Sequence, residues 1–264
     1  MRARNVGSVI MLSSALLIVG CSGGGGSGDG NIPPPVPNAA VGGLWAGETV
    51  IAGLGTYELI GIVAEDGRAY FVQEDGVMYW GTANSSGNQI TASLNGAGLL
   101  GSPLSDGSTS STGSVNGTIV ARASMSANST FTTARGSRTT GTISLSYEPS
   151  YDDDSSLALI AGNYVDALGL YAGVLNIASN GDVFLQDPDS GCVINGRIGI
   201  INSAYNAYDM QFSYNGCTGL DAAFNGVTFR GLASYDQEFE QAVALVHGSV
   251  GGIPYPNAFV FDRL

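Results

Sequence analysis

Short turn signals recur along most of the chain and constrain its fold more than any other feature. Residues 66–67 and 75–76 are Asp-Gly, residues 84–88 read NSSGN, and residues 180–181 are Asn-Gly. Each lies between runs rich in Val, Ile, Tyr and Phe, and such dipeptides are the strongest local signal for a tight β-hairpin. The spacing therefore predicts an antiparallel meander of short strands.

The runs between these turns favour an all-β fold. Thr, Val, Ile and Tyr dominate them, and glycine, with 40 residues, is far more frequent than usual. No stretch has a convincing 3.6-residue periodicity. The nearest candidate, residues 237–246, ends in a Val/Leu-rich run that also suits a strand. We expect the meander to pack as a barrel or a sandwich.

A faint internal repeat divides this β body into two halves. Each half contains four features in the same order: an aromatic residue, a turn followed by another aromatic residue, a glycine, and an Asn-Gly pair. They are Trp45, 66–70, Gly81 and 116–117 in the first half, and Tyr164, 180–184, Gly196 and 225–226 in the second. We expect two related units of four to six strands, at 41–148 and 161–264 with a connector at 149–160, which either close one barrel or form two lobes.

Two segments of the first half depart from this regularity. Residues 96–113 and 124–140 are rich in Ser, Thr, Gly and Asn and contain few large apolar side chains. They are predicted to be long exposed loops or weak edge strands. Loops on a rigid β scaffold often carry binding sites.

The N-terminus has the form of a bacterial export signal. Arg2 and Arg4 precede an apolar run, residues 9–19, that is too short to span a bilayer. The sequence Ile18-Val19-Gly20-Cys21 that ends it resembles the bacterial lipobox, with Ile where Leu is usual.

The lipobox resemblance implies a lipoprotein. Residues 1–20 would be removed, and Cys21 would be diacylated with fatty acids such as palmitate, which gives stable membrane anchoring. By the same resemblance, Ser22 favours transport to the outer membrane, with the face of the membrane left open. Residues 21–40, rich first in Gly and Ser and then in Pro, would form a tether.

The charge of the mature chain limits its partners. It would contain seven Arg, no Lys and 22 acidic residues, a net charge of −15. Such a chain should be repelled by nucleic acid and by anionic headgroups. A protein or small-ligand partner remains open, and the predicted contact with the membrane is through the lipid.

Two cysteines remain after Cys21 is assigned to the lipid. Cys192 and Cys217 form an even pair in an oxidising compartment and are predicted to be joined by a disulfide. A hairpin that turns around residues 203–206 would pair positions whose numbers sum to 409, which places the two cysteines opposite each other. The competing redox or metal-binding role has little support, because the chain has no CxxC and one His.

Candidate chemistry is sparse. His247 is the only imidazole, no GxSxG occurs, and a lone histidine here is interpreted as an ordinary strand-end residue. The acidic stretches 152–154 and 187–191 could offer oxygen ligands to Ca²⁺, but they lack EF-hand spacing and are interpreted as solvated linker and turn. We therefore predict no enzymatic activity, no cofactor and no metal site.

Tyrosines and tryptophans in or beside the predicted strands could pack in a core or line a pocket for an apolar ligand or a sugar. They are Tyr57, Tyr70, Tyr79, Trp80, Tyr164, Tyr205, Tyr208 and Tyr214.

The sequence as a whole favours a lipid-anchored cell-envelope protein with a non-catalytic binding or structural role. One alternative is a barrel-type carrier of a small hydrophobic ligand, which requires an internal cavity. The other is an envelope hydrolase, which requires two carboxylates or His247 in a cleft.

Overall fold

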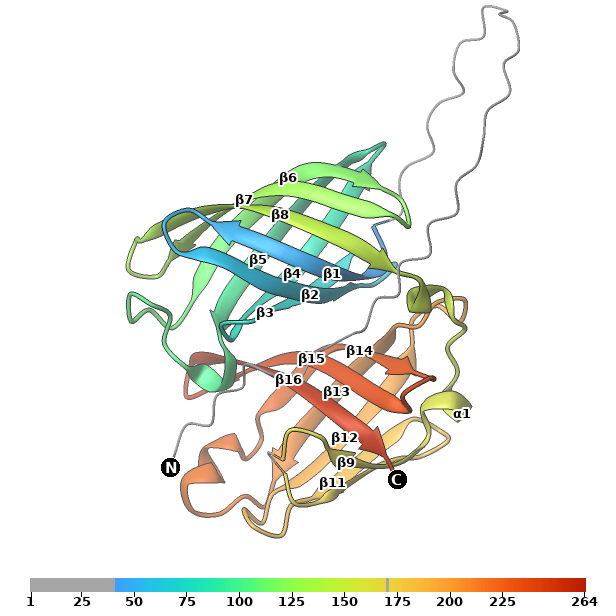
Figure 1. Ribbon diagram of the computed structural model, residues 1–264. Coiled ribbons are helices and arrows are strands. Elements are labelled where there is room, and N and C mark those ends of the chain that lie inside the picture. Colours follow the sequence, from blue (N-terminus) through green and yellow to red (C-terminus); the bar gives the residue numbers. More distant parts are fainter. Residues whose placement is uncertain (1–40, 170) are drawn as a thin grey trace, which may run out of the picture.

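The computed structural model describes residues 41–169 and 171–264, and these form two closed β-barrels (Figure 1). The all-β prediction is confirmed. Of the packings left open, each unit closes into its own barrel, and each has eight strands rather than the four to six predicted. The predicted signal peptide, the lipidated Cys21 and the tether lie outside the described residues.

The first barrel is an up-and-down meander in which β1 pairs with β8 to close the ring. Its two ends are formed by alternate turns, since every neighbouring pair is antiparallel. A short 3₁₀ turn, η1 (Leu99–Gly101), lies between β5 and β6. The strands are β1 (Gly43–Ile51), β2 (Gly55–Val63), β3 (Arg68–Gln73), β4 (Val77–Ser86), β5 (Gln89–Gly98), β6 (Ser111–Val120), β7 (Ser124–Thr133) and β8 (Arg138–Glu148).

The second barrel repeats this topology and closes between β9 and β16. The connection from the first barrel contains η2 (Pro149–Asp152) and a single helical turn, α1 (Leu157–Ile160), and η3 (Gly219–Phe224) precedes β14. The strands are β9 (Gly162–Asp166), β10 (Val174–Ile177), β11 (Asp182–Gln186), β12 (Val193–Ile200), β13 (Tyr208–Asn215), β14 (Thr228–Asp236), β15 (Gln241–Val250) and β16 (Ile253–Arg263).

The internal repeat corresponds to equivalent places in the two barrels. The Asp66 and Asn180 turns both connect a second strand to a third, and each side chain accepts a bond from the amide two residues later. In the first strands, Trp45 Nε1 donates to a carbonyl four residues earlier at 3.2 Å, and Tyr164 Oη does the same at 2.7 Å.

One part of the predicted repeat is wrong. The Asn-Gly pair at 116–117 lies inside β6, whereas the pair at 225–226 lies in the loop before β14. The structural counterpart of Gly117 in the sixth strand of the second barrel is Gly231. An added Cβ at either glycine would clash with a carbonyl oxygen of the next strand. Gly81 and Gly196, both in fourth strands, show the same close approach. These glycines allow the sharp coiling that closes a small barrel.

The two polar segments of the first half, predicted as long loops or weak edge strands, differ in structure: residues 124–140 are largely strand within a closed barrel, whereas residues 96–113 are mostly a 3₁₀ turn and a loop. Residues 124–140 form β7, a tight turn and the start of β8, and residues 96–113 form the end of β5, η1, a loop and the start of β6. Along β7, the buried Met125, Ala127 and Ser129 point into the barrel, and the residues between them are exposed. The sequence shows little alternation between apolar and polar residues here, because small side chains occupy the inward positions of the strand.

The barrels pack through outer faces of their walls. Leu232 of β14 and Leu245 of β15 are fully buried in the cluster that includes Met78 and Tyr70 of the first barrel. Arg68 forms an ion pair with Asp209 of β13 across the same junction. In Figure 1, β14, β15 and β16 of the lower barrel accordingly lie beneath β2 and β3 of the upper one. Within the described residues, no helix has the length and apolar character needed to cross a membrane.

Candidate functional site

The first barrel encloses a void of about 40 Å³ along its axis. Its base is apolar and buried, with Val63, Ala83, Met125 and Leu145 in the lining. Trp45 and Tyr147, in edge-to-face contact at 5.5 Å between ring centroids, lie at the same end of the barrel. The void is therefore closed below by packed side chains.

The opposite end of the void approaches the surface near the β1–β2 and β7–β8 turns. Ile51, Thr139 and Thr140 line it there and are partly or fully exposed. Polar side chains are concentrated in this half, where Thr49 and Ser129 also belong to the lining and are only 4% and 8% exposed. The cavity is therefore apolar at its base and mixed toward its mouth, where polar groups lie among Ile51, Tyr79 and Phe131.

Gln73 stands out in this polar half. It is the last residue of β3, and its side chain lines the void although it is only 3% exposed. Its Oε1 accepts a bond from Tyr79 Oη at 3.4 Å, but its Nε2 has no hydrogen-bond partner. An unsatisfied buried donor costs about 1–3 kcal/mol, so the position requires an explanation.

The interior of the second barrel is rich in packed aromatic side chains. Aromatic rings occupy its interior, and Phe212 contacts Phe229, Tyr214 and Phe259 with ring centroids 5.4 to 6.0 Å apart. Tyr171 and Tyr214 join their hydroxyls at 2.7 Å within the same core. The two barrels thus share a topology and differ in the side chains that occupy their interiors.

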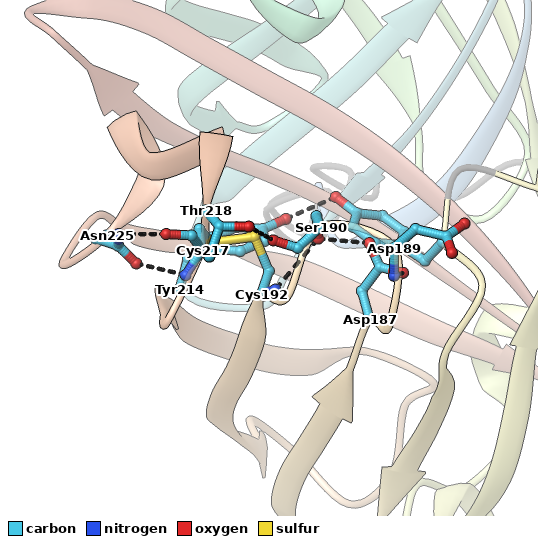
Figure 2. Close-up of a disulfide and its surroundings, with 9 residues drawn as sticks. Asp187, Asp189, Ser190, Cys192, Tyr214, Cys217, Thr218 and Asn225 are labelled. Atoms are coloured by element: carbon cyan, nitrogen blue, oxygen red, sulfur yellow. Dashed lines mark hydrogen bonds between the residues drawn. A yellow bond between two sulfur atoms is a disulfide. The ribbon is translucent and has the colours of Figure 1, made fainter. Parts of the chain in front are cut away.

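The predicted disulfide between Cys192 and Cys217 is confirmed (Figure 2). The predicted register is wrong by one residue, because β12 and β13 pair at positions whose numbers sum to 408, as in Val193 with Asn215. Gly216 adopts a left-handed conformation (φ 69°) just beyond this last rung. Gly216 is thus one extra residue in the second strand's path, and it places Cys217 opposite Cys192.

The acidic loop beside the disulfide uses its carboxylate internally. Asp187 is buried and accepts bonds from Ser190 Oγ at 2.6 Å and from the Asp189 amide at 3.3 Å (Figure 2). Burial alone would raise the pKa of Asp187, but the bonds from Ser190 and neighbouring amides lower it below its usual value. This carboxylate therefore stabilises the conformation of its own loop.

The other acidic stretch, residues 152–154, contributes to the connector. Asp152 forms an ion pair with Arg122 of the β6–β7 turn and accepts a bond from Tyr147 Oη at 2.8 Å. No cluster of three or more potential metal ligands occurs among residues 41–169 and 171–264.

His247 lies at the junction of the two barrels, in the middle of β15 rather than at a strand end. Its ring stacks on Trp80 with centroids 4.9 Å apart, and its Nδ1 lies 3.1 Å from Tyr70 Oη. Burial, and then the charge of nearby Arg230, lower the pKa of His247 to about 4. The residue therefore packs at the junction as a neutral ring.

The remaining predicted aromatics separate into three groups. Tyr79 lines the cavity of the first barrel. Tyr164, Tyr208 and Tyr214 are buried in the second barrel. Tyr57 donates to Leu54 O near the mouth of the first barrel, and Tyr205 stacks on Tyr151 of the connector.

Sequence reasoning missed Gln73, Thr49 and Ser129 as candidate site residues. The available signal was a Gln at an inward position of an apolar strand, in the run AYFVQ, where an aliphatic side chain would be usual.

Comparisons with protein families, curated proteins and solved structures gave no match to this chain.

Proposed function

We propose that this protein is a lipid-anchored, non-catalytic binding protein of the bacterial outer membrane, and that its first barrel binds a small hydrophobic molecule. The observation that carries the binding role is the void inside the first barrel, which has an apolar base and approaches the surface at its other end. Small eight-stranded barrels can hold one small ligand when side chains leave room.

The size of the void defines the kind of ligand. A volume of about 40 Å³ is well below the roughly 150 Å³ of a cavity that holds benzene, so it suits the end of a thin chain. Met125, with its flexible thioether, borders the void and can move aside for a longer chain.

Methionine methyl groups provide a direct test of ligand binding. Met1 and Met11 lie in the predicted signal, so the mature chain has Met125 at the cavity, Met210 in the second barrel and Met78 at the junction. In an unlipidated Cys21→Ala chain labelled with ¹³C-methyl methionine, n-hexane is expected to shift Met125 alone. The unlipidated chain avoids detergent, which would itself dissolve hexane.

Two variants on β5 make the test specific. Ala92→Leu fills the void and should abolish the Met125 shift, whereas Thr91→Leu, on the exposed outer face, should leave it unchanged. If Met125 in the wild-type chain is unaffected by saturating hexane, or if all three methyl groups shift equally, the carrier role is wrong.

The anchor is tested separately. Labelled palmitate is expected to enter the wild-type protein and not Cys21→Ala, and the acylated protein should fractionate with the outer membrane. Equal labelling of the two proteins would exclude lipidation at Cys21.

A further inference from the structure

The buried amide of Gln73 indicates which chemical group a ligand presents in this cavity. Its Nε2 is a hydrogen-bond donor without a partner, and the side chain is 97% buried in the cavity lining. Tyr79 Oη donates to Oε1 of the same amide, which directs Nε2 away from Tyr79. A ligand atom that accepts a hydrogen bond would satisfy the group.

The distribution of polarity orients the ligand. Val63, Ala83 and Leu145 line the base, and Gln73, Thr49 and Thr139 lie in the half toward the mouth. Binding therefore favours a molecule whose apolar chain points to the base and whose polar atom stays in the outer half.

The absence of charge restricts the polar atom further. Among the residues that the structure describes, the cavity lining includes none of Asp, Glu, Lys, Arg or His. An ion in such a site would lose its hydration in exchange for a single neutral amide donor and no opposite charge. A neutral oxygen, as in a ketone, ester or amide, has much less hydration to lose.

We propose that the first barrel binds a slender neutral amphiphile whose carbonyl-type oxygen accepts a hydrogen bond from Gln73 Nε2. This inference rests on the proposed function, because it specifies the ligand of the same cavity. It adds a specificity-determining residue, Gln73, to a site otherwise defined by shape.

The test compares ligands of equal chain length in the same Met125 titration. The probes are n-hexane, 2-hexanone and hexanoate, measured against the wild-type chain and Gln73→Leu, which removes the donor while keeping a similar volume. We expect Gln73→Leu to weaken 2-hexanone about tenfold, equivalent to about 1.4 kcal/mol. It should leave hexane unchanged or bound more tightly, and the wild-type chain should prefer 2-hexanone to hexanoate.

Each outcome is decisive. Retained hexane binding and unchanged Met210 and Met78 signals show that Gln73→Leu is folded. If 2-hexanone binds both chains equally, a water molecule serves the amide and the inference is wrong, although the carrier role survives. Tighter binding of hexanoate than of 2-hexanone would contradict the neutral ligand. If no probe shifts Met125 in the wild-type chain, the proposed function itself fails.

Discussion

The single residue His247 couples the stability of the fold to pH. The unfolded chain takes up a proton near pH 6.5, whereas the folded chain, with the pKa of His247 lowered to about 4, does so only in more acidic solution. Stability from the neutral ring is therefore fully present above pH 6.5 and is lost as the pH falls toward 4. We expect a loss of about 1–3 kcal/mol in the free energy of unfolding over this window.

The matched control is His247→Gln, which cannot titrate and keeps an acceptor for Tyr70. Urea unfolding at pH 7 and pH 4.5 should show a smaller pH dependence for the variant, since the titration of the carboxylates is common to both chains. Equal pH dependence would mean that His247 does not titrate across this range.

Single residues were the least predictable part of the site. His247 could be found from the sequence, but its partners Trp80 and Tyr70 come from another barrel, and no local pattern places them together. The sequence marks Gln73 as a candidate site residue only when it is already known that its strand faces a barrel interior that contains a void. The orphaned Nε2 depends on the positions of all neighbouring side chains.

Most of the strands could be predicted from the residues of the turns that separate them. The Asp66 and Asn180 turns and the hairpin at Asp75 were predicted, because Gly after Asp or Asn signals a hairpin locally. For β7 the sequence left a loop and a weak edge strand open, because its inward residues are small and the hydropathy hardly alternates. The disulfide pairing was correct although the register was off by one, because Gly216 adds a residue that spacing alone does not reveal.

The disulfide stabilises the β12–β13 hairpin in a measurable way. It closes a loop with a sequence separation of 25 residues, which corresponds to about 3 kcal/mol in the chain-entropy model. The double variant Cys192→Ser/Cys217→Ser should lose about that much stability in urea unfolding. Treatment of the wild-type chain with reductant should reproduce the loss, and reductant should have no effect on the variant. A variant as stable as the oxidised wild type would contradict this account.

Residues 41–264 contain seven arginines in a chain with a large acidic excess, and several of these arginines connect different parts of the molecule. Arg68 pairs with Asp209 across the junction, Arg122 holds the connector, and Arg263 binds the carbonyl oxygens of Leu159 and Ala161. The Arg68 and Arg122 pairs are partly exposed, and such pairs contribute about 0–1 kcal/mol each. The apolar junction therefore holds the two barrels together more strongly than these ion pairs do.

Leu232 tests whether the barrels unfold as one unit. It projects from the second barrel and is fully buried against the core cluster of the first, so Leu232→Ala should cost about 2–4 kcal/mol. With the junction intact, the Met125 and Met210 methyl signals should disappear at the same urea concentration. In the variant they should separate, because each barrel then unfolds on its own. Leu54→Ala, at an exposed turn, is the control and should change stability by less than about 0.5 kcal/mol. Coincident loss of the two signals in Leu232→Ala at an unchanged midpoint would show that the junction does not couple the barrels.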